Sequence, residues 1–217
     1  MNPILKSKSL LCAITLVAAL VLQAQEWNQF QAQPASSVKI EGTSTIHDWT
    51  MEGQIIGGVL KLKKDFQLDA NTKPGKVAAE SQVSIPVRSL KSGKSTMDEI
   101  MQQAMNEKDF KKIEFKLTEL TLKEVPAGGN GAFNFEVAGE LSMSGKTNKI
   151  TMPVEILKIN PVRLEIRGKK PLKMTDYGIP PPAPSIAGGL IKTGDEVTIS
   201  FIWKVAVKVE AAKPADK

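Results

Sequence analysis

The chain has 217 residues, of which 29 are basic and 23 acidic, with a formal net charge of +6, one histidine and one cysteine. A single histidine and a single cysteine exclude the His/Cys clusters that hold zinc, copper or haem, so we expect no metal site. The basic residues are scattered rather than interleaved with aromatic residues, which argues against nucleic acid as a partner. A chain of this length buries roughly 70% of its unfolded surface, enough for one core.

The N-terminus has the features of a secretory signal peptide. Lys6 and Lys8 precede an apolar run over residues 10–22, which is too short to span a bilayer because a spanning helix needs about 20 residues. The small residue Ala24 follows, so we predict that residues 1–24 are cleaved and that the protein is exported to the periplasm or outside the cell. An uncleaved membrane anchor is the alternative. Cleavage would remove the only cysteine, leaving no disulfide.

After an expected leader over residues 25–37, alternation with period two predicts strands as far as residue 209. In the last of them, apolar residues at odd positions from Val197 to Val209 alternate with mostly polar residues, which is typical of a strand with one apolar face. The polar tail over residues 210–217 is expected to be unfolded. The same pattern predicts about eight strands: 38–42, 46–56, 79–87, 113–122, 133–143, 149–156, 162–167 and 197–209.

Short connections predict how these strands pair. Ser144-Gly145 and Asn160-Pro161 are turn-like, and short connections force sequential antiparallel pairing. Within 113–122 the apolar positions switch from odd to even numbers, so we predict a β-bulge near Thr118 and Glu119.

One segment has helical spacing instead. Its apolar residues recur at steps of three and four and form one stripe, and Ser95 or Thr96 could cap its start. We expect this helix between the third and fourth predicted strands. The stripe consists of Met97, Ile100, Met101, Ala104 and Met105.

An antiparallel set of this size folds as a two-sheet sandwich or as a closed barrel. The segment from Pro171 to Asp195 favours a barrel. It is 25 residues long, rich in proline and apolar residues, and too long for an ordinary connection inside a compact domain. We interpret it as a lid or rim over a barrel opening, the alternative being a merely structural loop that covers the barrel end. The all-β fold expected is therefore an antiparallel barrel of about eight strands with one short inserted helix.

A catalytic site is not expected. A serine–histidine–acid arrangement would have to use His47 with Ser44 and Asp48, and proximity along a strand is not triad geometry. We therefore assign His47 a hydrogen-bonded structural role and predict that the protein is not an enzyme.

Ordered motifs across most of the chain resemble the YceI-like family. The match covers roughly Val38 to Val209, and its last motif looks like the family's Asp-aromatic-Gly-Ile-x-Pro element. The motifs are Glu41–Trp49, Val83–Gly93 leading into Met97-Asp98 and Met101, Ile113–Phe115, Val137–Leu141 with Gly145–Thr147, and Met174–Pro181.

The resemblance implies a lipocalin-like barrel that holds a polyisoprenoid, an isoprenoid quinone or a similar amphiphile in an apolar pore, as an exported carrier or reservoir. The alternative is an envelope interaction or stress module with a filled core, acting through its surface. By analogy with the family we also expect a homodimer, and we add transient membrane contact as a further expected interaction. The family supplies no catalytic residues. The expected ligand-binding residues are Trp49, Met97, Met101, Met105, Phe110, Met174, Tyr177 and Ile179.

Overall fold

A computed structural model of the chain describes residues 27–183 and 191–207. The predicted signal peptide, the polar tail and part of the long loop lie outside these residues. Within the described ranges, no helix has the length and apolar character needed to cross a membrane.

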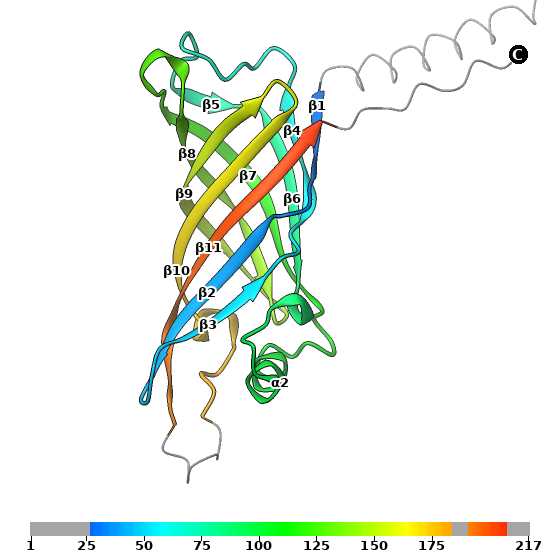
Figure 1. Ribbon diagram of the computed structural model, residues 1–217, viewed down its shortest axis with the longest axis vertical. Coiled ribbons are helices and arrows are strands. Elements are labelled where there is room, and N and C mark those ends of the chain that lie inside the picture. Colours follow the sequence, from blue (N-terminus) through cyan, green and yellow to red (C-terminus); the bar gives the residue numbers. More distant parts are fainter. Residues whose placement is uncertain (1–26, 184–190, 208–217) are drawn as a thin grey trace, which may run out of the picture.

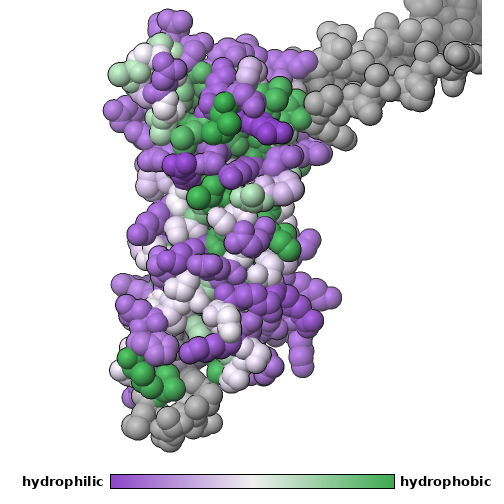
Figure 2. All heavy atoms as spheres, viewed as in Figure 1, coloured by the Kyte–Doolittle hydropathy of each residue, from purple (hydrophilic) through white to green (hydrophobic). Residues whose placement is uncertain are grey.

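The chain forms a closed antiparallel barrel with one α-helix at one end (Figure 1). Figure 2 shows hydrophilic residues over much of the outer face in view, as expected where polar side chains alternate with inward apolar ones. The strands are β1 (Trp27–Ala32), β2 (Ser37–Ser44), β3 (Trp49–Gly53), β4 (Gly57–Lys63), β5 (Gly75–Val77), β6 (Ala79–Pro86), β7 (Lys112–Glu124), β8 (Ala132–Met143), β9 (Lys146–Asn160), β10 (Arg163–Lys173) and β11 (Thr193–Val207). The helices are α2 (Ser95–Ala104) and the 3-10 turns η2 (Val87–Ser89), η3 (Ala127–Gly129) and η4 (Thr175–Tyr177).

Eight strand positions close the ring, in the order β1-β4-β6-β7-β8-β9-β10-β11 with β11 returning to β1. Strands β1 and β2 lie one after the other along β11, which pairs with β1 near Val207 and with β2 over most of its remaining length. Strands β3 and β4 follow each other in the same way, beside β2 and β1 respectively. Each pair is thus one interrupted strand, and the predicted barrel of eight antiparallel strands is confirmed.

The segment between β1 and β2 is hydrogen-bonded to β11. Ser36 is almost fully buried, and its hydroxyl donates to the Gln33 carbonyl oxygen at 2.9 Å and accepts from the Lys204 backbone N–H at 3.0 Å. Ala35 beside it has a positive φ of 64°. Strand β1 falls within residues 25–37, the segment expected to be a leader, so the barrel begins upstream of residue 38. An interrupted strand has too few alternating residues on either side to be recognised as one element.

The predicted bulge is confirmed. The register of β7 against β8 shifts between Leu117, which pairs with Gly139, and Glu119, which pairs with Ala138, leaving Thr118 as the extra residue. A bulge lets the strand change which of its side chains face inward without leaving the sheet.

The helix α2 lies between β6 and β7, as predicted, but its cap differs. Its N-cap residue is Lys94, without a side-chain cap, and Ser95 and Thr96 lie inside the first turn. The Ser92 hydroxyl, just before the helix, accepts from the Lys94 backbone N–H at 3.1 Å. The segment 46–56, predicted as one strand, contains a turn followed by the five-residue β3.

The end of the barrel far from α2 is filled by side chains. Strands β4, β7, β8 and β11 contribute fully buried residues there, and Leu68 from the β4–β5 connection packs with them. The hollow part of the barrel therefore lies toward α2. The packed residues include Leu62, Leu68, Leu122, Phe133 and Val205, each no more than 6% exposed.

Candidate functional site

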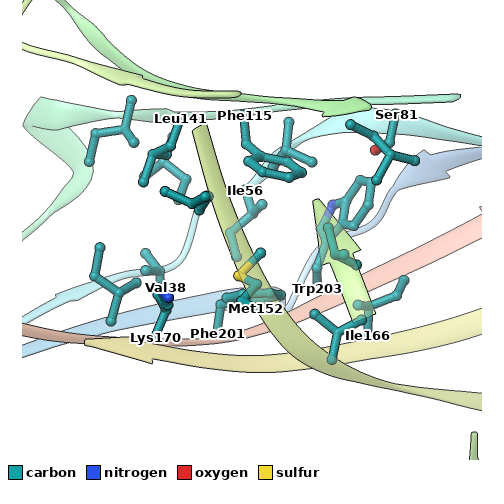
Figure 3. A pocket seen from close by; sticks show the side chains of 18 of the residues that line it. Val38, Ile56, Ser81, Phe115, Leu141, Met152, Ile166, Lys170, Phe201 and Trp203 are labelled. Carbon is teal, nitrogen blue, oxygen red and sulfur yellow. The ribbon is translucent and has the colours of Figure 1, made fainter. Parts of the chain in front are cut away.

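The barrel encloses an inner chamber of about 140 Å³ (Figure 3). Of the residues lining it, only Ser81 and Lys170 are polar, apart from the indole nitrogen of Trp203. Inward-facing residues of β11 make one wall, in the order Ile199, Phe201 and Trp203 from the α2 end. An apolar cavity of this size stays dry when empty and accepts apolar ligands.

Aromatic rings lying over glycines shape this chamber. On Gly139 of β8, an added Cβ would lie 2.3 Å from Cζ of Phe115, and on Gly168 of β10 it would lie 2.5 Å from Cζ of Phe201. Both aromatic residues line the chamber. The two glycines therefore let the rings lie flat against the barrel wall, which leaves the centre of the barrel open.

A larger outer chamber of about 460 Å³ lies between the barrel mouth, α2 and the segment that follows β10. Helix α2 covers it with its apolar stripe, as its spacing predicted. Ile40, Ile113, Leu172 and Ile199 line both chambers, so the two chambers adjoin within the barrel and are together called the apolar tunnel. From Val197 at the mouth to Trp203 at the inner end, β11 advances by six residue steps, or roughly 20 Å at about 3.3 Å per step.

The structure places seven of the eight predicted ligand-binding residues at the outer chamber. These are Trp49, Met97, Met101, Met105, Met174, Tyr177 and Ile179.

Phe110 is placed elsewhere. It lines neither chamber, is 40% exposed, and its ring packs over Gly145 in the β8–β9 turn, where an added Cβ would lie 2.5 Å from Cζ. It follows the end of α2 rather than continuing the helical stripe, so it has no place in the proposed site.

Sequence reasoning did not single out the inner chamber. The signal was present in the alternation of β11, of which Ile199, Phe201 and Trp203 face the chamber. Which inward residues border free space, rather than packed neighbours, depends on the register of all eight strands and cannot be read from one strand.

The segment expected to be a long loop is shorter in the structure. Strand β10 continues to Lys173 and β11 begins at Thr193, so both strands extend into the segment expected to be a loop. The sequence did not reveal these strand ends because the alternation of apolar and polar residues weakens there. The described part of the connection forms a rim over the outer chamber, and its own residues Tyr177 and Ile179 are buried against that chamber. Burial raises the pKa of the Tyr177 hydroxyl, which keeps it neutral.

Asp195 fixes this rim to β11. Its carboxylate accepts from the Thr175 backbone N–H at 2.9 Å and from the Thr175 hydroxyl at 2.7 Å. These hydrogen bonds lower the pKa of the Asp195 carboxyl. These charge-assisted bonds add to the backbone hydrogen bond from the Met174 N–H to the Asp195 carbonyl oxygen at 3.0 Å in holding the rim.

The buried carboxylate of Asp98 fixes α2 over the mouth. It accepts from the backbone N–H and the hydroxyl of Ser92 at 2.7 and 2.8 Å, and Lys91 lies 3.4 Å away. Lys91 is also hydrogen-bonded through its backbone to Glu52 of β3. Burial alone would raise the pKa of Asp98, but the hydrogen bonds from Ser92 and the charge of Lys91 bring it below its ordinary value.

We expect Asp98→Asn to lower the free energy of unfolding at pH 7 by about 2 kcal/mol, the scale of a buried hydrogen bond to a charged group. A carboxyl whose pKa is lower in the folded state stabilises the fold above its unfolded pKa of about 3.9, and that stabilisation is lost as the pH falls through the folded value. Urea unfolding at pH 7 and pH 3 measures this, and the difference between variant and wild type should shrink at pH 3. Exposed Glu99 on the same helix provides the control, Glu99→Gln. Equal stabilities of Asp98→Asn and wild type at pH 7 would contradict the assignment.

A third hollow, which we call the lateral slot, has a volume of about 680 Å³ and opens between β9 and β10 on the side of the barrel. The pairing of these strands stops at Gly168 and Val154, and within the described residues their α2-proximal parts are not paired with each other. Lys170 spans the gap, donating from Nζ to the Thr151 carbonyl oxygen at 2.9 Å. Lys170 also lines the inner chamber, so the inner chamber and the lateral slot adjoin at the Lys170 side chain.

The serine, histidine and acid singled out in the sequence do not form a catalytic arrangement. The Ser44 hydroxyl donates to the backbone oxygen of His47 at 2.7 Å, and His47 Nδ1 donates to the backbone oxygen of Asp48 at 2.8 Å. All three residues lie in or beside the turn between β2 and β3, where these bonds hold the turn together. The geometry lacks a contact between nucleophile and base.

The closed ring and the apolar tunnel together define an eight-stranded β-barrel protein with an internal chamber. A family model described as YceI-like domain matches residues 30–205, and the chain belongs to that family. The matched range includes the end of β1, in agreement with its place in the barrel.

Two solved structures share the fold. The polyisoprenoid-binding domain from Saccharophagus degradans, implicated in plant cell wall breakdown, has a TM-score of 0.60 and 13% identity, covering 83% of this chain and 99% of that one. BcnA of Burkholderia cenocepacia has a TM-score of 0.57 and 19% identity, covering 78% and 95%. A comparison with curated proteins gave no match.

Proposed function

We propose that this protein binds one long apolar amphiphile, a polyisoprenoid, an isoprenoid quinone or a similar lipid, without catalysing a reaction. The observation that carries the proposal is the apolar tunnel, formed by adjoining chambers of about 140 and 460 Å³. Pockets that hold small molecules are mostly apolar and of this overall size. The polyisoprenoid-binding description of the Saccharophagus degradans domain, which has the same fold, supports the ligand class.

The binding energy needs no catalytic group. Burial of about ten methylenes at about 0.8 kcal/mol each contributes about 8 kcal/mol, which corresponds to micromolar affinity. The methionines of α2 suit a ligand of variable shape because their side chains are flexible and polarizable. We further propose an exported carrier or reservoir, since the N-terminal segment has the pattern of a signal peptide. The homodimer and the transient membrane contact stay predictions.

The surface-interaction module is the weaker candidate. It requires a barrel filled by its own side chains, and here only the end far from α2 is filled.

The test is native mass spectrometry of the protein expressed with its own N-terminus and purified without detergent from the exported fraction. We expect a stoichiometric adduct, and fragmentation of the extracted lipid should show isoprene repeats. The polypeptide mass in the same spectrum tests cleavage after Ala24. A folded protein that stays empty after incubation with isoprenoids, quinones and fatty acids would favour the surface-interaction module.

A further inference from the structure

Two buried polar atoms face the inner chamber without a hydrogen-bond partner. They are the hydroxyl oxygen of Ser81 on β6 and Nε1 of Trp203 on β11. Ser81 is 8% exposed and Trp203 is 5% exposed. In Figure 3 both side chains lie toward the same end of the chamber, away from Leu141 and Val38.

Such atoms usually find partners; among the described residues only the Tyr177 hydroxyl, which lines the outer chamber, is buried and unpartnered in the same way. Nε1 of Trp49 donates to the Thr43 carbonyl oxygen at 3.0 Å, and the buried hydroxyl of Ser36 is bonded to the backbone on two sides. A buried donor without an acceptor destabilises a protein, and native structures contain few of them. Two in one apolar chamber indicate that their partner is supplied from outside the chain.

The chemistry of the two atoms limits that partner. The indole Nε1–H can only donate, and a serine hydroxyl can both donate and accept. A ligand oxygen that accepts hydrogen bonds therefore suits both. Among the described residues, Lys170 is the one cation that lines this chamber, and its Nζ is already bonded to the Thr151 carbonyl oxygen beside the lateral slot. A neutral oxygen at the inner end would be bound without an unpaired charge in apolar surroundings.

We infer that Ser81 and Trp203 form a polar subsite at the inner end of the tunnel, which binds a neutral acceptor oxygen of the ligand. The inference rests on the proposed lipid-binding function and narrows the class of ligand that this function would involve. The preferred ligands are long apolar chains that carry a ketone, a quinone carbonyl or a similar oxygen on the end that enters first. A plain hydrocarbon would leave both groups unsatisfied, and a carboxylate would be drawn to Lys170 instead.

The test is a competition between chains matched in length. Full-length mature protein is equilibrated with equimolar nonadecan-2-one, nonadecane and nonadecanoic acid in mixed micelles, then re-isolated, and the bound compounds are quantified by gas chromatography with mass detection. We expect the ketone to exceed the hydrocarbon about fivefold, the value of one net hydrogen bond. Ser81→Ala and Trp203→Phe should each reduce this ratio toward one, while Ser81→Thr, which keeps the hydroxyl, should retain it.

Ser84→Ala is the matched control, because Ser84 is on the same strand but faces outward and should leave the ratio unchanged. Indole proton spectra of ¹⁵N-tryptophan-labelled protein give a second measurement. The Trp203 signal, assigned by its absence in Trp203→Phe, should move downfield with the ketone and not with the hydrocarbon. The signal of Trp27, which is on β1 and lines neither chamber, serves as internal reference.

Equal binding of ketone and hydrocarbon, or a preference that Ser81→Ala and Trp203→Phe leave intact, would overturn the subsite while leaving the proposed function standing. A preference for the acid that disappears in Lys170→Met would also overturn it, by placing the headgroup at the lateral slot. Binding of none of the three compounds to protein with wild-type stability would overturn the proposed function, and this inference with it.

Discussion

Replacement of Ile199 by tryptophan is expected to abolish binding of long apolar chains while the barrel stays folded. Ile199 lines both chambers, so a larger side chain at this position blocks the passage between them. If half of a ten-methylene chain is excluded, about 4 kcal/mol of apolar burial is lost, which weakens binding roughly a thousandfold. The measurement is a titration with a fluorescent long-chain lipid, together with thermal unfolding to establish that the variant is folded.

The matched control is Ile202→Trp on the same strand. Ile202 is 37% exposed and faces outward, so the same change in volume should leave binding intact. Short chains that fit within the outer chamber should still bind to Ile199→Trp. Undiminished binding of long chains by Ile199→Trp would show that the ligand does not thread from one chamber into the other.

The parts of the fold that could be predicted are those that depend on the local sequence pattern. Alternation assigns each strand residue to a face whatever its partner, which is why the strands from β6 to β11 and the bulge at Thr118 could be read from the sequence. Strands β1 and β4 could not be placed with the same ease, because β1 continues into β2 and β4 continues from β3 through irregular backbone. Their place in the ring depends on long-range pairing with β11 and with each other.

The candidate site likewise has parts that the local sequence pattern predicted and a part that it could not predict. The stripe of α2 and the apolar residues after β10 lie at the mouth because their spacing and hydrophobicity leave them one face to bury. The segment after β10 was expected over the opening, whereas the methionines of the helix were expected only to contact the ligand. The inner chamber was not foreseen, because free volume depends on the rotamers of side chains from opposite strands. Phe115 and Phe201 leave the centre open only because a glycine lies beneath each ring.

The second large effect is expected from Gly139→Ala, which should destabilise the barrel by about 3 kcal/mol, the upper range for overpacking. The added Cβ would lie 2.3 Å from Cζ of Phe115 and 2.6 Å from the Lys116 carbonyl oxygen. The ring can move only into the inner chamber, and the carbonyl belongs to β7 next to its bulge and cannot move freely. Urea unfolding measures the loss of stability, and lipid titration the accompanying loss of chamber volume.

Gly57→Ala separates this clash from the general cost of replacing a strand glycine. At Gly57 the nearest atom to an added Cβ is the Ser84 hydroxyl oxygen at 3.4 Å, an ordinary contact, so that variant should keep wild-type stability within about 0.5 kcal/mol. Adding Phe115→Leu to Gly139→Ala should recover part of the lost stability, because it removes the ring but leaves the carbonyl. If Gly139→Ala proves as stable as Gly57→Ala, the ring does not depend on the glycine, and the chamber must be kept open by the rest of the barrel wall.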